Sequence, residues 1–221
     1  MTNTQFGFDI AISSCSPYGI GIDFTVPTGI ATIASKTGAG GWCTAGNILA
    51  YDSSGNYVEC SITYAYNISG LTRGWYFWYG YNGTGTYVAL SADPTSDSVT
   101  LSLLYNGTNW IAFLTDHTNS SNNHSKSFSS SIAGYVIKSG DIWFENGGDT
   151  NCCDYSSTFG GMTFSNLTFY NQSGGTITCS ASVTGLVPGN HNQPTSNCAN
   201  TKSICITETV NTSTYVLATN G

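Results

Sequence analysis

The stretch "SVTLSLLYNGTNWIAFLT" (98–115) decides the fold class of this chain. Apolar and polar residues alternate on both sides of Asn106-Gly107. An Asn-Gly pair between two alternating runs is the strongest short-range hairpin signal, so the stretch predicts two antiparallel strands joined by a tight turn. A second pair, Asn82-Gly83, follows the aromatic run "GWYFWYGY" (74–81) and indicates another hairpin.

The same period of two dominates the rest of the chain, and no long amphipathic helix is predicted. Further strands are expected at 6–13, 18–26, 55–66, 132–138, 141–146 and 161–170. Strands of this number and spacing are typical of sandwiches and jelly rolls. We therefore expect an all-β fold, a disulfide-stabilised antiparallel β-sandwich or jelly roll over residues 1–172. A C-terminal β extension at 173–221 is expected to pack on it.

Composition excludes several classes of partner. Charged residues make up only 8% of the 221 residues, and the net charge is −7 with five scattered Lys and Arg. Binding to nucleic acid or anionic lipid needs clustered basic residues, so neither nucleic acid nor membrane insertion is expected. Few charges also predict tolerance of acid, because little self-repulsion develops when the carboxylates are protonated. The alternative is a surface simply solvated by hydroxyls and amides.

Eight dispersed cysteines predict up to four disulfides and an oxidising compartment. The spacing leaves the pairing open. We expect an extracellular, secreted protein, or one on a virion surface, although no signal peptide is visible at the N-terminus. Eight N-x-S/T sequons are compatible with a glycoprotein.

Glutamate is rare in this chain, which contains only Glu59, Glu145 and Glu208. Alternation puts Glu59 on the polar face of strand 55–66 and Glu145 on the polar face of strand 141–146. If the two strands share a sheet, the carboxyls can approach, and one of them then keeps a proton. Such a pair supplies a base for water and an acid for a leaving nitrogen. The alternative is two solvated glutamates on an outward face.

Six short motifs occur in the order "DFTVP" (23–27), "GGW" (40–42), "YVECS" (57–61), "WYFWYGY" (75–81), "GDIWFENGG" (140–148) and "FGGMTFSNLTF" (159–169). In these motifs the chain resembles the glutamic peptidases, over roughly residues 20–170. The fungal eqolisins use a Gln–Glu dyad on a β-sandwich. Their glutamate strand matches at Glu145, but Glu59 or Ser61 stands where the glutamine is expected. The neprosin-like glutamic peptidases use two glutamates and are similar at "ECSITYAY" and "FENGG".

The resemblance implies an acid-active endopeptidase with Glu59 and Glu145 as the acid/base pair and a polypeptide as substrate. Asp141 is expected in a supporting role beside Glu145. Together with Asp141, the residues expected to line the substrate cleft are Trp75, Phe77, Tyr79 and Trp143. An aromatic strand buried on both faces is the alternative for the run at 75–81.

No metal site or cofactor is expected, because the three histidines lie in polar loops without a zinc-binding frame. The rival functional class is a non-catalytic sandwich that assembles with copies of itself. In that case "FGFDIAIS" or "STYVLAT" would be donated as a strand to a neighbour. A third alternative is a glycan-binding module with stacking platforms among Trp75, Trp78, Trp110 and Trp143.

Overall fold

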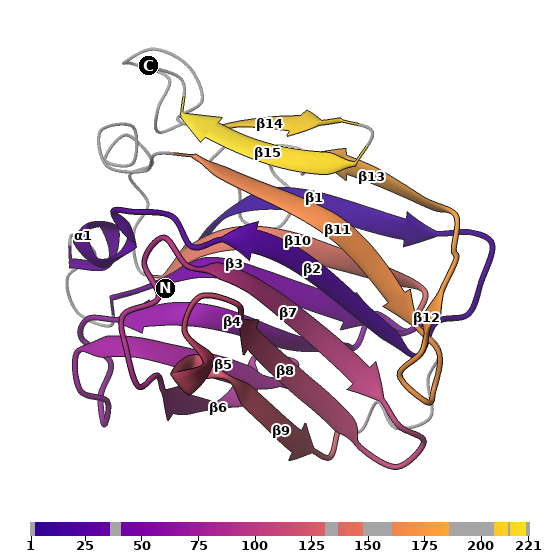
Figure 1. Ribbon diagram of the computed structural model, residues 1–221, viewed down its shortest axis with the longest axis horizontal. Coiled ribbons are helices and arrows are strands. Elements are labelled where there is room, and N and C mark those ends of the chain that lie inside the picture. The colour runs from indigo at the N-terminus through magenta and orange to yellow at the C-terminus, as the bar shows by residue number, and fades with distance from the viewer. Residues whose placement is uncertain are drawn as a thin grey trace.

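Two antiparallel sheets packed face to face form the protein in the computed structural model (Figure 1). The structure describes residues 3–35, 41–130, 137–147, 161–185, 206–211 and 213–219. Among these, the side chains of residues 3–5, 33, 143–147, 206–208 and 218–219 are not described. The predicted β-sandwich is confirmed. The expected strand 132–138 lies almost entirely outside the described residues.

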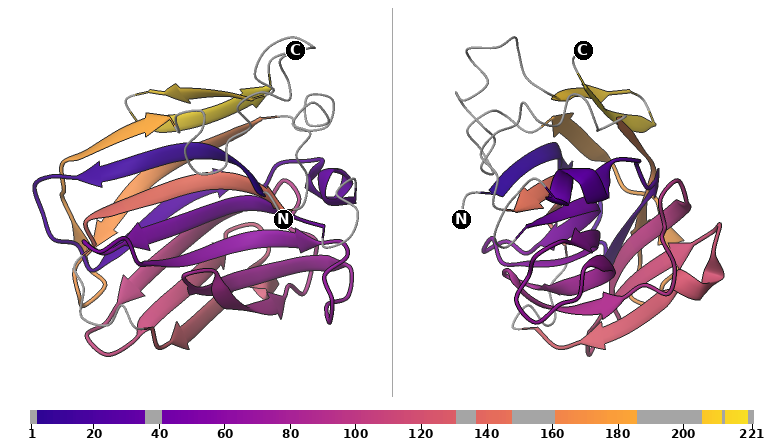
Figure 2. Two further views of the ribbon diagram at one scale, coloured as in Figure 1. Left: turned by 180° about the vertical axis from the view of Figure 1, so that it is seen from behind. Right: turned by 90° about the vertical axis from the view of Figure 1, so that its left-hand side faces the viewer.

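The first sheet has seven strands in the order β13-β1-β10-β3-β4-β5-β6. It faces the viewer in the left-hand view of Figure 2. Its strands are β1 (Asn3–Ile12), β3 (Trp42–Tyr51), β4 (Tyr57–Ala65), β5 (Gly74–Tyr81), β6 (Thr84–Ala89), β10 (Ser139–Gly147) and β13 (Ala181–Gly185).

The second sheet has eight strands, in the order β14-β15-β11-β2-β7-β8-β9 with β12 paired to β11. Its strands are β2 (Gly19–Thr25), β7 (Ser98–Tyr105), β8 (Trp110–Asp116), β9 (His124–Phe128), β11 (Met162–Tyr170), β12 (Thr176–Ile177), β14 (Ile206–Val210) and β15 (Thr214–Thr219). A short helix α1 (Ile30–Ser35) follows β2, and the 3-10 turn η1 (Ser120–Asn122) precedes β9.

Both predicted hairpins form. β7 and β8 pair from Val99 opposite Asp116 to Tyr105 opposite Trp110, with the turn at Asn106-Gly107. Asn82 and Gly83 both have positive φ, 45° and 73°, as a tight turn between twisted strands requires.

The core lies between the two sheets and follows the alternation of the strands. In β4, Val58, Cys60, Ile62 and Tyr64 belong to the core while Glu59, Ser61 and Thr63 point to the opposite face. We call this opposite side of the seven-stranded sheet the outer face. Some residues of the outer face are nevertheless buried, since Ser61 and Thr63 are each 2% exposed.

The C-terminal residues complete both sheets. β13 pairs with β1 at one edge of the first sheet, and β15 pairs with β11 in the second. The segment expected as an extension from residue 173 therefore contributes strands to each layer, as Figure 1 shows. No separate C-terminal unit is visible in the pairing of the described strands.

One disulfide joins Cys15 to Cys179 across 164 positions of sequence. Cys43 and Cys60 are buried thiols, so the upper limit of four disulfides set by eight cysteines is not reached, while the expected disulfide stabilisation is confirmed. Cys152, Cys153, Cys198 and Cys205 lie outside the described residues.

Breaking the Cys15–Cys179 bond is expected to lower the free energy of unfolding by about 2–5 kcal/mol, because the bond restricts a long loop of the unfolded chain. Urea denaturation of Cys15→Ser, Cys179→Ser and the double variant tests this. The double variant should be no less stable than either single variant, since one substitution already removes the bond. Losses that add up would contradict the pairing.

Candidate active site

Four residues of the seven-stranded sheet lie side by side in one cross-strand row. The register pairs Asp9 with Asp141, Asp141 with Leu49, and Leu49 with Glu59. Residues directly opposite one another in antiparallel strands project from the same face. We call Asp9, Asp141, Leu49 and Glu59 the carboxyl row.

The carboxyl row lies on the outer face, because its neighbours along each strand belong to the core. These core neighbours are Phe8, Ile10, Ile48, Ala50, Val58, Cys60 and Ile142. Nevertheless, Asp141 is only 4% exposed and Glu59 only 8%. Leu49 lies between them, fully buried in a small separate cluster with Tyr51 and Tyr57. Two nearly buried carboxyls thus flank an apolar residue.

Tyr51 fixes the position of Asp141. Its hydroxyl donates a hydrogen bond of 2.5 Å to Asp141 Oδ2. Burial and then the neighbouring Asp141 carboxylate raise the pKa of Tyr51 far above its usual value, so the hydroxyl remains a donor at any working pH. The Tyr51 and Tyr57 rings contact each other at a centroid distance of 5.5 Å.

Asp141 keeps its proton at neutral pH. Burial is the largest cause of the raised pKa. The charge of Asp9 and the hydrogen bond between Asp9 and Asp141 raise the pKa further, whereas the hydrogen bond from Tyr51 lowers it. Together they raise the pKa of Asp141 to about 8. An acid with such a pKa can donate a proton at neutral pH.

One strand, β3, separates the strands of Asp141 and Glu59. Neighbouring strands are about 4.8 Å apart, so the two backbones are roughly 10 Å apart. The side chain of Leu49, which is fully buried, occupies part of this interval.

Glu145 is not in the carboxyl row. Its backbone pairs with Gln5 of β1, four residues along β10 from Asp141, or roughly 13 Å at about 3.3 Å per residue. A bulge between Trp143 and Asn146 also shifts the pairing of β10 with β3. β4 and β10 share a sheet, as the predicted pair required, but the register brings Asp141 rather than Glu145 to the level of Glu59. The side chains of Trp143 and Glu145 lie outside the described residues.

The prediction that Trp75, Phe77 and Tyr79 line the cleft is wrong. Trp75 and Phe77 belong to the core, and Tyr79 packs against it and against Phe128 of β9. Because Glu59 is opposite Gly80, the even-numbered residues of β5 share its face. The aromatic residues on that face are therefore Tyr76 and Trp78.

A second row on the outer face is polar. Ser61 lies opposite Asn47 of β3 on one side and Trp78 of β5 on the other. The Ser61 and Thr63 hydroxyls are hydrogen-bonded at 2.8 Å. Asn47 Oδ1 is buried and, in the part of the chain that the structure describes, meets no hydrogen-bond donor. Buried hydrogen-bonding groups thus lie beside the carboxyl row and next to aromatic residues.

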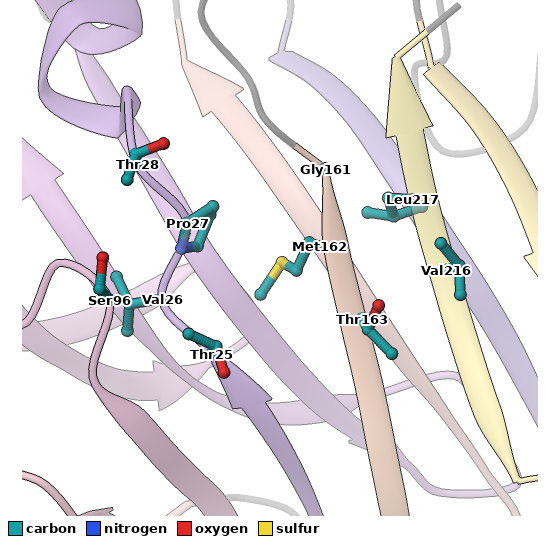
Figure 3. A pocket seen from close by; sticks show the side chains of 10 residues that line it. All are labelled: Thr25, Val26, Pro27, Thr28, Ser96, Gly161, Met162, Thr163, Val216 and Leu217. Carbon is teal, nitrogen blue, oxygen red and sulfur yellow. The ribbon is translucent and has the colours of Figure 1, made fainter.

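A pocket of about 430 Å³ opens elsewhere, where β2 leaves the second sheet beside the start of β11 (Figure 3). Val26, Pro27, Met162 and Leu217 line it together with hydroxyl-bearing residues. None of its lining residues is an acid, a base or a thiol. It therefore offers no acid–base chemistry, in contrast to the carboxyl row.

Both strands and two of the four tryptophans expected to serve the rival functions are used within the fold. "FGFDIAIS" belongs to β1, which pairs with β10 and β13, and "STYVLAT" belongs to β15, which pairs with β11 and β14. Trp75 and Trp110 are core residues, 8% and 1% exposed, and cannot stack on a sugar. Among the described residues, no helix is long and apolar enough to cross a membrane.

Comparison with solved structures shows the eqolisin-type glutamic peptidase fold. Scytalidoglutamic peptidase with a transition-state analogue inhibitor has a TM-score of 0.61, with 16% identity over 98% of both chains. SCP-B, an eqolisin-family peptidase in complex with the tripeptide Ala-Ile-His, has a TM-score of 0.56, with 15% identity over 98% of both chains. No protein-family model matches the chain. No curated protein matches it significantly. The predicted resemblance is thus confirmed for the fold.

Three residues of this site were not identified from the sequence, namely Asp9, Leu49 and Tyr51. Asp9 carried a usable signal, because it is the only charged residue in the alternating run "FGFDIAIS". Leu49 and Tyr51 lie on β3, whose strand character does not show in an alternating pattern.

Proposed function

We propose that this protein is an endopeptidase that hydrolyses peptide bonds with water, using Glu59 and Asp141 as its general base and general acid. The observation that carries the proposal is the carboxyl row, in which two nearly buried acids flank Leu49 on a fold shared with glutamic peptidases. Glu145, the partner expected from the sequence motifs, has less support than Asp141 because of its register.

The raised pKa of Asp141 determines the assignment of roles. Asp141 is the acid, and Glu59 is left as the base. Glu59 takes a proton from water as the oxygen attacks the scissile carbonyl carbon. Asp141 gives its proton to the leaving nitrogen as the carbon–nitrogen bond breaks. The elements of one water are then divided between the two products, and Asp141 regains a proton when Glu59 releases one.

The surroundings of the carboxyl row favour an extended polypeptide as substrate. Ser61, Thr63 and Asn47 place hydroxyls and an amide in the buried layer beside the row. Tyr76, Trp78 and Tyr87 form a connected aromatic group on the same face, with ring centroids 5.8 and 6.4 Å apart. Aromatic rings beside hydrogen-bonding groups are typical of peptide-binding surfaces.

Incubation of the wild-type protein with a denatured polypeptide from pH 3 to pH 9 tests this function. We expect internal cleavage, seen by mass spectrometry as new peptide termini, with no added metal or cofactor. A substrate that stays intact at every pH would overturn the proposal.

The pH dependence of kcat/KM is expected to have an alkaline limb near pH 8. Asp141 must hold a proton to act as the acid, so activity falls as pH rises through its pKa of about 8, by about tenfold for each further unit. Activity should therefore extend from acid into neutral pH, and loss of activity by pH 6 would contradict the assignment of Asp141 as the acid.

We also infer that the protein acts outside the cell. The Cys15–Cys179 disulfide supports this location, since such bonds persist in oxidising compartments.

A further inference from the structure

Asp9 is a third acid in the carboxyl row, on the far side of Asp141 from Glu59. Its Cα is directly opposite that of Asp141 in the β1–β10 pair, and the two side chains are hydrogen-bonded to each other. Phe8 and Ile10, its neighbours along β1, are core residues that are 0% and 1% exposed. Asp9 is therefore held on the outer face beside Asp141 by the packing of its own strand.

The two carboxyls differ in their access to water. Asp141 is 4% exposed, whereas Asp9 is half-buried. Two adjacent carboxyls do not ionise independently, and the more buried of them holds the proton more strongly. In this pair the proton therefore resides on Asp141, the more buried of the two.

We propose that Asp9 is a positioning residue that keeps the proton on Asp141. In this role it acts only through Asp141, since Leu49 and Asp141 separate it from Glu59 in the row. The role in catalysis rests on the proposed peptidase function, whereas the shared proton does not.

The other groups that face Asp141 are consistent with this role. Tyr51 of β3 donates to Asp141 Oδ2, and Tyr57 of β4 contacts Tyr51. Glu59 of β4 lies beyond Leu49 and adds a further negative charge on the same face. On β13, the residue opposite Asp9 is the uncharged Thr184.

None of the described basic residues faces the pair. Arg73 donates to the Tyr64 hydroxyl, Lys126 is on β9 in the other sheet, and Lys138 is exposed before the start of β10. Asp9 is thus the nearest described charge to Asp141. Removal of this charge is expected to lower the pKa of Asp141.

Asp9→Asn removes the charge of Asp9 with almost no change of size. We expect the alkaline limb of kcat/KM to move to lower pH by about one unit or more, because Asp141 then releases its proton more readily. For a one-unit shift the loss relative to wild type should therefore grow with pH, to about fivefold at pH 8 and towards tenfold above it. Asp9→Glu keeps the charge and should keep the alkaline limb within a few tenths of a unit of the wild-type position.

Carbon-13 NMR of the aspartate carboxyls tests the shared proton without any substrate. The Asp141 signal is identified by its absence in Asp141→Asn. We expect this signal to titrate near pH 8 in the wild type and at clearly lower pH in Asp9→Asn. If both this titration and the alkaline limb stay unchanged in Asp9→Asn, the role of Asp9 is refuted. If the wild type cleaves nothing, the peptidase proposal fails, yet the NMR titration still decides whether Asp9 holds the proton on Asp141.

Discussion

Asp141→Asn is expected to reduce kcat/KM for a denatured polypeptide by about 10²- to 10⁴-fold, the usual contribution of a general acid. Asparagine has nearly the same shape and can still accept the hydrogen bond from the Tyr51 hydroxyl. It has no proton to give to a leaving nitrogen, so the loss should appear in kcat and not mainly in KM.

Glu145→Gln is the matched comparison, because it is an equally conservative change on the same strand. Since Glu145 lies four residues along β10 from the carboxyl row, we expect Glu145→Gln to cleave the substrate within a few-fold of the wild-type rate. If Glu145→Gln abolishes cleavage while Asp141→Asn preserves it, the pair predicted from the sequence motifs is correct and the register-based assignment is wrong. Circular dichroism and thermal unfolding would confirm that both variants fold.

Glu59→Gln is expected to cause a loss of similar size, about 10²- to 10⁴-fold, because an amide cannot take a proton from water. This variant is informative for a second reason. It places a glutamine at one of the two positions, 59 and 61, where the eqolisin resemblance expects one, across β3 from Asp141 of β10. Strong remaining activity would mean that residue 59 acts as a hydrogen-bond donor and that Asp141 is the base.

The pH dependence separates these two assignments. With Glu59 as base and Asp141 as acid, activity falls on both sides of an optimum between acid pH and about pH 8. If Asp141 were the base, activity would instead rise as pH increases through the pKa of Asp141. Comparing the profiles of the wild type and Glu59→Gln distinguishes the two directions.

The strands that alternate strictly could be predicted from the sequence, and so could the faces of β4. Val58, Cys60 and Ile62 enter the core and Glu59 faces outward, because one-residue alternation is a local property of a strand. The two Asn-Gly turns were equally local. These features were enough to predict the fold class and the outward orientation of Glu59, one of the two nearly buried acids of the carboxyl row.

β3 could not be recognised in this way, because its eight interior residues are buried on both faces and do not alternate. Its small residues have a packing reason. At Gly46, a Cβ atom would lie 2.5 Å from the Phe24 ring of the facing sheet, so this position accepts no side chain. This close approach depends on a residue of the other sheet and leaves no periodic signal in the sequence.

Glu145 was expected as the partner of Glu59 because of the motif resemblance, and with β3 unrecognised no register was at hand to compare Glu145 with Asp141. Which residue of β10 lies level with Glu59 of β4 depends on two pairings, that of β10 with β3 and that of β3 with β4. Each pairing contains one irregularity in its register. A shift of four residues along one strand keeps the same face, so alternation alone cannot distinguish Asp141 from Glu145. The same limit applies to β5, where only the register of Gly80 against Glu59 shows which aromatic residues share the outer face.

A crystal structure with a peptide-based transition-state analogue is the most direct test of the central claim. Such an analogue is bound in a structure of scytalidoglutamic peptidase, whose fold this chain shares. We expect its tetrahedral group to lie above Leu49, within hydrogen-bonding distance of both Glu59 and Asp141. An analogue bound away from the carboxyl row, or contacting Glu145 in place of Asp141, would contradict the account.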